Sequence, residues 1–464
     1  MDEGKTSLVE KSLSLALYLW SGASIFFVFC NGALYFWKGP DAFHRLIQRG
    51  PFSITTLTFA SVAVVWSSLG AALVLLQNRR LRTRHGLTVI CTLLLLLLYA
   101  NILRERTAYG DVGAYIRAAR DLVRGASLDS RYLYPPFLAT ILTPLARCGD
   151  TTIGGVCWAA NLLSLGLFVV LLRTALVRYG FGNRLSVLLV FLLVAINAPI
   201  LRTLLYVQIN LHVANLILIA LLAFPRLPFL SAAALALAVH LKASPIVLAL
   251  PFVLNRNWRW SAWFAAMLAA FAGVTVGAYG WQPFLDFIHN VRNIHDANGI
   301  VFRDTSVDSF FRSSATALGF SPQVVLWPIL VAKLGLLAAV LLTMVRVERN
   351  RAFVRDDQPG QNVRNAVPVL LLFMLLGSPL VWEHHAVFVA LTYLLVLKRL
   401  ATPGECVWFG AAYVLEYLLP TFDFYPWSFG RLLSPLILLG LIYATARRSE
   451  DDTLLARLSH ASAS

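Results

Sequence analysis

The chain has 464 residues, of which 58% are hydrophobic and only 13% are charged, and its mean hydropathy is +0.71. This composition indicates a protein that crosses a membrane many times, and it excludes a large soluble domain. The formal net charge of +16 comes from lysines and arginines in short clusters between apolar runs. Such clusters indicate a role in membrane topology and exclude nucleic acid as a partner.

Apolar runs suited to membrane-crossing helices recur along the whole chain. Because about 20 apolar residues cross the hydrocarbon core as a helix, we predict an all-α, polytopic transmembrane helical bundle. We expect about 12–14 spans, with interfacial helices on the outer face. The predicted spans are residues 12–37, 54–77, 86–103, 151–172, 185–199, 207–224, 228–241, 245–255, 260–280, 322–345, 366–381, 385–397, 404–420 and 431–446. The short pair around residues 242–245 favours a broken or re-entrant hairpin, which is tolerated where its freed backbone lines a protein cavity.

The predicted spans divide the chain into three parts. Residues 1–85 form an N-terminal two-span extension with a basic cytoplasmic loop, residues 86–400 form the core, and residues 401–464 hold C-terminal spans and a cytoplasmic tail. The basic clusters fall in every second gap between spans, which assigns those gaps to the cytoplasmic side. The opposite, outer loops then carry nearly all of the unusual polar residues.

The first outer loop begins at Asp111 and holds an amphipathic stretch that stops at Gly125. Its apolar residues follow helical spacing and its arginines occupy the other face, so we predict an interfacial helix in the headgroup plane. The apolar positions are Val112, Tyr115, Ile116, Ala119, Leu122 and Val123. An aspartate directly before a helix is also a good N-cap, so capping and a functional role for Asp111 are both open.

Two further outer segments hold aromatic and polar residues. Tyr134-Pro135-Pro136 is not helical, because Pro135 lacks a backbone donor and forces Tyr134 out of the helical region. This turn is either a structural junction or, together with Asp111, part of a site. Residues 284–294 form a second amphipathic stretch. Two interfacial helices on one side provide either a shelf for an amphiphile or a lipid-facing loop region.

Polar residues within or beside the apolar runs are candidates for function, because placing them in a membrane is costly. They are Arg202, Gln208, Asn210, His212, His240, Lys242, Glu383, His384 and His385. A zinc site at His384-His385 is not favoured, since neighbouring residues on a helix point about 100° apart. The same histidines, with Lys242, Arg202 or Arg312, are suited to donate hydrogen bonds to a phosphate.

Several short motifs follow one another in order along the core. They are Asp111 with Tyr115, Ala118-Ala119 and Gly125; Tyr134-Pro135-Pro136; Gln208-Ile209-Asn210; Lys242-Ala243-Ser244-Pro245; an Asp-Ser…Arg segment; and Ser378-Pro379-Leu380-Val381-Trp382-Glu383-His384-His385. In this order they resemble glycosyltransferase family 87, which comprises polytopic enzymes of the C-type glycosyltransferase fold. That family includes mycobacterial α-mannosyl- and arabinofuranosyltransferases that use polyprenyl-phosphate sugars. The resemblance covers roughly residues 101–397 and departs at residues 307–312, where the family usually shows an Asn-Gln-Ser type sequence.

The resemblance implies an enzyme whose core, residues 86–400, transfers a sugar from a polyprenyl-phosphate donor to a lipid or glycan acceptor among membrane lipids. Mannose is favoured over arabinofuranose as the sugar. Asp111 matches the catalytic carboxylate of the first outer loop in this fold. With an ordinary pKa near 4 it is ionised at neutral pH, so it accepts the proton of the acceptor hydroxyl as general base.

The remaining site residues are also assigned through the resemblance. The donor phosphate is expected to contact Lys242, His384, His385, Arg202 and Arg312, in falling order of expectation. The sugar or acceptor is expected to contact Tyr134, Gln208, Asn210 and Tyr115. We expect no metal and no cofactor. One base suffices for a direct displacement that inverts the anomeric centre, whereas a retaining enzyme needs a nucleophile such as Glu383 or Asp423.

The expected location is the cytoplasmic (inner) membrane, crossed many times, with the active site on the outer, periplasmic face. Two other classes fit parts of the pattern. A membrane transporter also has many spans and broken helices, but the candidate residues gather on one side and no repeat relates the two halves. A lipid-linked polysaccharide polymerase or ligase also places arginine and histidine near a lipid pyrophosphate. A third, non-enzymatic alternative is a lipid-binding scaffold.

Overall fold

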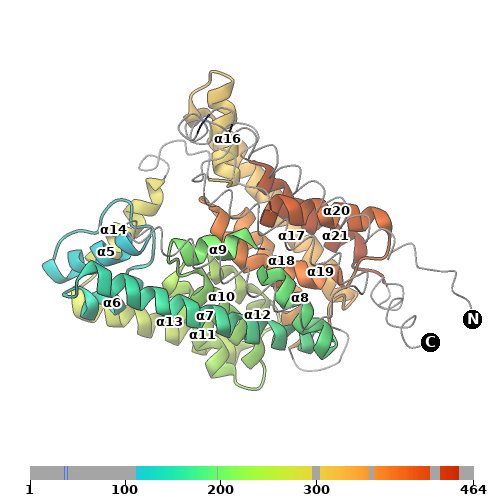
Figure 1. Cartoon of the computed structure of the whole chain (residues 1–464), viewed down its shortest axis with the longest axis horizontal. Helices are drawn as coiled ribbons and strands as arrows, with labels where there is room; N and C mark the ends of the chain where they lie inside the picture. The colour runs from blue at the N-terminus through green and yellow to red at the C-terminus, as the bar shows by residue number, and fades with distance from the viewer. Residues whose placement is uncertain are drawn as a thin grey trace, which may run out of the picture.

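The computed structural model describes Phe36, Gly39 and residues 111–195, 197–294, 304–354, 360–418 and 429–448 (Figure 1). The predicted spans at 54–77 and 86–103, nearly all of that at 12–37, and Asp423 lie outside the described residues. The described part is helical throughout and contains no strand. The predicted all-α, polytopic class is therefore confirmed.

The described helices follow the predicted spans closely along the chain. In order they are α5 (Val112–Arg124), α6 (Pro136–Leu142), η1 (Thr143–Leu145), α7 (Asp150–Arg178), α8 (Asn183–Ala195), α9 (Ala198–Leu205), α10 (Asn210–Ala223), α11 (Pro228–Leu241), η2 (Ser244–Ala249), α12 (Leu250–Leu254), α13 (Trp258–Tyr279), α14 (Gln282–Arg292), α16 (Val307–Ala317), η3 (Pro322–Val325), α17 (Leu326–Arg349), α18 (Gln361–Leu376), η4 (Glu383–Val389), α19 (Ala390–Leu397), α20 (Pro403–Tyr413), η5 (Val414–Leu418) and α21 (Gly430–Thr445).

Three of the described helices are long and apolar enough to cross a membrane, judged by length and composition. They are Asp150–Arg178, Trp258–Tyr279 and Pro322–Arg349. The other apolar helices of the described ranges have 10–17 residues, as α10 and α11 with 14 residues each illustrate. Fourteen residues of helix rise about 21 Å, less than the hydrocarbon core of about 30 Å. Three helices of the described part are therefore long enough for a full crossing, and three of the predicted spans lie wholly or mostly outside that part.

Local sequence signals explain where the helices around the outer loops begin and end. α5 ends at Gly125, which adopts the left-handed conformation with φ of 67° and closes the helix with hydrogen bonds to the carbonyls of Asp121 and Leu122. α6 begins at Pro136 after the extended Pro135. α11 ends at Leu241, and the chain passes through the extended Lys242 into a short 3-10 helix, η2. The predicted break in this hairpin is confirmed.

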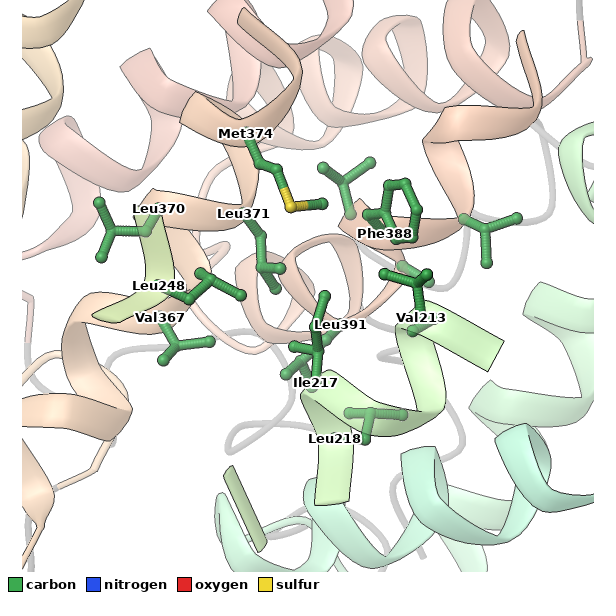
Figure 2. Packing of buried hydrophobic residues seen from close by; sticks show 14 of the residues in the cluster. Val213, Ile217, Leu218, Leu248, Val367, Leu370, Leu371, Met374, Phe388 and Leu391 are labelled. Carbon is green, nitrogen blue, oxygen red and sulfur yellow. The ribbon is translucent and has the colours of Figure 1, made fainter. Parts of the chain in front are cut away.

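Part of the core lies where the 3-10 helix η4 packs on both α10 and α18 (Figure 2). Val213 of α10 lies beside Phe388 of η4, and Ile217 lies beside Leu391 of α19, within one buried apolar cluster. α10 also packs on α7 and α11. Close packing of this kind holds helices together inside a bilayer, where lipid and protein interior are equally apolar. η4 is thereby held rigidly against the bundle.

Helix α7 connects two chemically different ends of the bundle. At its first residue, the Asp150 carboxylate accepts a 2.6 Å ion pair from Arg120 of α5. Just past its last residue, Tyr179 donates to the Arg364 carbonyl at 2.8 Å and accepts from Lys398 Nζ at 2.9 Å. Since 29 residues of helix extend about 43 Å, the α5 end and the basic end are a membrane thickness apart.

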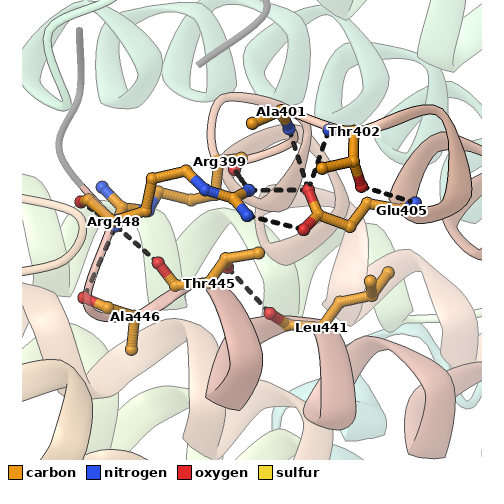
Figure 3. A network of polar contacts seen from close by, with 8 residues as sticks. All are labelled: Arg399, Ala401, Thr402, Glu405, Leu441, Thr445, Ala446 and Arg448. Carbon is orange, nitrogen blue, oxygen red and sulfur yellow. Dashed lines mark hydrogen bonds and ion pairs between the residues drawn. The ribbon is translucent and has the colours of Figure 1, made fainter. Parts of the chain in front are cut away.

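The basic end is fastened by charged hydrogen bonds (Figure 3). Arg399 donates to the carbonyls of Thr445 and Arg448 at 2.7 Å, which satisfies groups left free at the end of α21. Arg448 in turn pairs with both oxygens of Glu405 at 2.6 and 2.7 Å. This network is a structural clamp between α20 and the end of α21, and it contains none of the residues that line the cavity described below.

Candidate active site

One cavity, with a volume of about 610 Å³, brings together most of the residues that the motifs single out. Its size is in the range of ligand pockets, about 300–1,000 Å³. Polar lining comes from Asp111, Arg131, Tyr134, Arg202, Tyr206, Gln208, Lys242, Ser244, Ser378, Trp382, Glu383, His384 and His385. Apolar lining comes mainly from η2, α14 and α18 through Ile246, Val247, Phe287, Val291, Ile294, Phe373 and Met374. The cavity lining therefore has both polar and apolar side chains, as an amphiphilic ligand requires.

Asp111 stands at the N-cap position of α5, but its side chain makes no capping hydrogen bond. Only its backbone carbonyl takes part in the helix, accepting from Ala114 and Tyr115. Within the described part of the chain, the carboxylate has no hydrogen bond and no ion pair, although it lines the cavity and is partly buried. Capping therefore does not account for this residue, and its acid group is available to a ligand.

Burial raises the pKa of the Asp111 carboxyl from 3.8 to about 6, and the nearby Lys242 limits the rise. The expected ordinary pKa near 4 is thus wrong, because removing water from around the carboxylate disfavours its charged form. The group is still mostly ionised at pH 7. A carboxylate with a raised pKa is a stronger base than an ordinary aspartate, which suits proton transfer near neutral pH.

Lys242 lies in the break between α11 and η2, and its amine is held by two side chains. Nζ is 3.0 Å from Asn210 Oδ1 and 2.7 Å from His385 Nε2. Burial lowers the pKa of Lys242 to about 7, against the attraction of Asp111. The rings of Tyr134 and Phe388 lie 5.9 and 5.5 Å from Nζ, within reach of a cation–π contact. The amine is therefore poised to gain a proton when an anion arrives.

The ring of His385 is held by a backbone group, and the backbone of His384 is held by a side chain. His385 Nδ1 accepts from the Trp382 backbone N–H at 3.3 Å, so the ring proton of a neutral His385 sits on Nε2, toward Lys242. The carbonyl of His384 accepts from Asn210 Nδ2 at 3.2 Å. Asn210 thus ties η4 to the lysine, and the polar cluster does not hold a metal-binding geometry: no group of three or more metal-ligating side chains occurs in the described ranges.

Two tyrosines meet Gln208 beside the cavity. The hydroxyls of Tyr115 and Tyr134 donate to Gln208 Oε1 at 3.1 and 3.3 Å, and their rings cross edge-to-face with centroids 5.0 Å apart. Tyr134 and Gln208 line the cavity, whereas Tyr115 supports them from behind. Asn210 likewise acts behind the lining, through Lys242 and His384. The predicted sugar or acceptor residues therefore form one connected group.

A buried charge network lies on the other side of the cavity. Glu383 forms ion pairs with Arg202 at 3.4 Å and with Arg431 of α21 at 3.0 Å. Arg202 Nη1 also donates to the Tyr206 hydroxyl at 3.2 Å. Arg202 and Glu383 line the cavity, so the arginine is positioned near a ligand by its carboxylate partner. With both arginines beside it, Glu383 is engaged as a counter-ion.

The model of glycosyltransferase family 87 matches residues 132–379, which is more than half of the 464-residue chain. The chain belongs to glycosyltransferase family 87. The matched range is shorter than residues 101–397, and it holds Lys242 but leaves out Asp111 and His384-His385.

Two curated relatives of this family 87 chain carry the same name, polyprenol-phosphate-mannose-dependent alpha-(1-2)-phosphatidylinositol mannoside mannosyltransferase. The protein from Mycolicibacterium smegmatis is 28% identical over 303 residues, covering 61% of this chain and 65% of the relative. The protein from Mycobacterium tuberculosis is 27% identical over 282 residues, covering 56% of this chain and 60% of the relative. The chain therefore spans less than two thirds of the length of either relative. No solved structure matches the chain.

The cavity of this family 87 protein also shows what motif analysis left out. Arg312, a predicted phosphate contact, lies on α16 and does not line the cavity. His240 packs against Phe137 and bonds the Leu268 carbonyl at 2.9 Å, a structural role. The motifs assign no role to Trp382, although it lies within the motif of residues 378–385. They also assign none to Arg431, because nothing in the sequence links Arg431 to Glu383.

Proposed function

We propose that this family 87 chain is an integral-membrane glycosyltransferase that moves mannose from a polyprenyl-phosphate donor to a lipid or glycan acceptor. The observation that carries the proposal is a cavity in which the carboxylate of Asp111, unpaired among the described residues, shares a lining with the Lys242 and His385 pair. Family membership and the names of both curated relatives support the choice of donor and sugar. A base that shares a cavity with a cation suits proton removal from a hydroxyl together with loss of a phosphate.

In the proposed reaction, an acceptor hydroxyl oxygen attacks the anomeric carbon of mannose. Its proton passes to the carboxylate of Asp111, while the bond between the anomeric carbon and the phosphate oxygen breaks and its electron pair stays on that oxygen. The raised pKa of Asp111 makes it a better proton acceptor. No step needs an added metal or cofactor.

The leaving polyprenyl phosphate gains negative charge, which fixed cations and donors stabilise. Lys242 is the first candidate, because a phosphate beside its amine favours the protonated form. His384 and His385 line the same region, and Arg202 contributes from the Glu383 network. The burial of His384 and His385 strengthens their contacts with a charged group.

We propose that the transfer inverts the anomeric centre. Direct displacement needs one base, and the ion pairs of Glu383 leave this carboxylate poorly suited to act as a nucleophile. A β-linked donor then gives an α-mannoside, the linkage in the names of the relatives. The acceptor class that those names favour is a phosphatidylinositol mannoside glycolipid.

We place the reaction at the outer face of the cytoplasmic membrane. The cavity lies by α5 and the start of α7, whereas Arg364, Lys398 and Arg399 gather by the other end of α7. Basic residues prefer the cytoplasmic side, so the cavity end is the outer one. The apolar wall from α14 and η2 offers a surface for the polyprenyl chain.

The test is transfer of labelled mannose by the purified protein in proteoliposomes. Supplied with a radiolabelled polyprenyl phosphomannose and a phosphatidylinositol mannoside, the protein is expected to form a labelled glycolipid that an α-mannosidase cleaves. A β-linked product would refute inversion from a β-linked donor. Translocation of the donor without any labelled product would indicate a transporter, and incorporation into long polymers a polymerase or ligase.

A further inference from the structure

Arg131 is a cation of the cavity that the proposed reaction does not use. It lies in the loop between α5 and α6, it lines the cavity, and it is exposed, so it stands where the cavity meets solvent. Its guanidinium forms no hydrogen bond and no ion pair with any described residue. An arginine that is open to solvent, lines a cavity and has no described partner is available to an anionic ligand.

The backbone on both sides of Arg131 is held by hydrogen bonds. Asn290 of α14 donates from Nδ2 to the carbonyls of Asp129 and Tyr132, at 2.9 and 3.2 Å. The backbone N–H of Arg131 donates to Asp129 Oδ1 at 2.8 Å, and the Tyr132 side chain is buried. Since both neighbours are fixed, the guanidinium of Arg131 is kept at the cavity.

The other charged residues of the cavity lining compensate one another. Arg202 forms an ion pair with Glu383 at 3.4 Å. Asp111 and Lys242 attract each other electrostatically. Arg131 is thus the lining residue, among those that the structure describes, whose charge has no opposite charge paired with it. A cavity with this surplus attracts an anion to the side where Arg131 lies.

Arg131 and Lys242 have different surroundings within the one cavity. Lys242 directly precedes η2, which contributes apolar lining through Ile246 and Val247. The loop of Arg131 is anchored instead on α14, where the Leu128 N–H donates to Asp286 Oδ2 at 2.9 Å. This helix contributes apolar lining through Phe287 and Val291. The cavity therefore places a cation beside an apolar surface twice, which suits two amphiphiles that each carry a phosphate next to their chains.

We propose that Arg131 binds the phosphate of the acceptor lipid and so makes the enzyme prefer an anionic phosphoglycolipid over an uncharged glycolipid. The inference rests on the proposed function, because it requires donor and acceptor in the same cavity. The donor carries one phosphate, whose proposed place is beside Lys242, so a second phosphate-binding cation serves the second substrate. The planar guanidinium suits this role, since it donates two parallel N–H bonds to phosphate oxygens.

The experiment measures mannose transfer by Arg131→Met in a neutral detergent, with two acceptors. A phosphatidylinositol mannoside carries a phosphate, whereas octyl α-mannoside offers the same kind of hydroxyl without one. The KM for the phosphatidylinositol mannoside should rise roughly 5- to 20-fold, while the KM values for octyl α-mannoside and for the donor stay unchanged. Arg124→Met is the matched control, because Arg124 is also exposed, lies on the last turn of α5 and does not line the cavity. It should keep all three wild-type KM values.

Salt dependence gives a second readout of the same contact. Because Arg131 is exposed, added salt should raise the wild-type KM for the phosphatidylinositol mannoside, Arg131→Lys should keep this dependence, and Arg131→Met should lose most of it. An unchanged KM for the phosphatidylinositol mannoside in Arg131→Met, or an equal rise for octyl α-mannoside, would overturn the inference. A rise in the donor KM alone would assign the guanidinium to the donor phosphate and would overturn it too.

Binding without transfer separates this inference from the proposed function. The deacylated, water-soluble headgroup of the phosphatidylinositol mannoside keeps the phosphate, and its binding to the purified wild type and Arg131→Met is measured by titration calorimetry. Tighter binding by the wild type, by roughly 5- to 20-fold, supports the phosphate contact even if no mannose is transferred, in which case the proposed function alone fails. Equal binding by the two proteins would overturn the inference even if transfer is normal.

Discussion

Replacing Asp111 with asparagine is expected to abolish activity and, at the same time, to stabilise the fold. The substitution keeps the size of the side chain and removes its charge. A general base contributes about 10²- to 10⁴-fold to rate, so kcat should fall by that factor while the donor still binds. A capping aspartate would behave differently, because asparagine is an equally good N-cap.

The magnitude of the stabilisation follows from the raised pKa. The shift from 3.8 to about 6 means that ionising Asp111 costs more in the folded than in the unfolded chain. At about 1.4 kcal/mol per pH unit, the penalty is at most about 3 kcal/mol. Below pH 4 the group is protonated in both states and the penalty vanishes; it grows between pH 4 and 6 and is complete above pH 6.

The assay is thermal unfolding of the purified protein in detergent across pH 4 to 8, beside mannosyl transfer. Asp111→Asn should unfold at a higher temperature than the wild type at pH 7.5, and the difference should disappear near pH 4. Asp150→Asn is the matched control, because it removes an exposed ion pair with Arg120 outside the cavity. That control should keep full activity and change stability by less than about 1 kcal/mol. An inactive but destabilised Asp111→Asn, or one that retains turnover, would refute the reasoning.

Three further outcomes are expected. For Lys242→Met, the KM for the donor should rise at least about 10-fold in steady-state kinetics. Lys398→Met, at the basic end, should leave the donor KM unchanged. A wild-type donor KM for Lys242→Met would contradict phosphate contact by Lys242. Wild-type kcat/KM should rise through about pH 6, as Asp111 loses its proton, and fall above about pH 7, as Lys242 loses its proton. A flat pH profile would exclude both assignments. Glu383→Gln removes the carboxylate shared by two arginines, so it should lower the free energy of unfolding by about 3–5 kcal/mol and also raise the donor KM. Glu405→Gln should affect stability alone. A normal donor KM for Glu383→Gln would argue against positioning of Arg202 through this carboxylate.

Much of the fold follows from patterns within one helix turn or two. The apolar spacing after Asp111 is sufficient to predict α5, and Gly125 ends it because glycine adopts the left-handed conformation easily. The break at Lys242 follows from a run too short to cross the bilayer and from the proline that comes after it. Motif order along the chain also predicted the family, which the family model confirms.

The site itself depends on contacts that no local pattern encodes. Tyr115 and Gln208 are 93 residues apart, and Lys242 and His385 are 143 residues apart. Their meeting is decided by how whole helices pack, which sequence periodicity does not specify. The exclusion of Arg312 from the cavity was likewise decided by the tertiary structure.

Asp111 shows most clearly which properties are local to the sequence and which depend on the tertiary structure. Sequence alone determined that an acid stands at the start of an amphipathic helix, because residue type and helical spacing are local properties. Whether its side chain caps the helix, and what pKa it has, depend on burial and on charges brought close by distant segments. Only the packed structure leaves this carboxylate uncapped, raises its pKa and places it in one cavity with Lys242, because water is excluded there by residues from many helices.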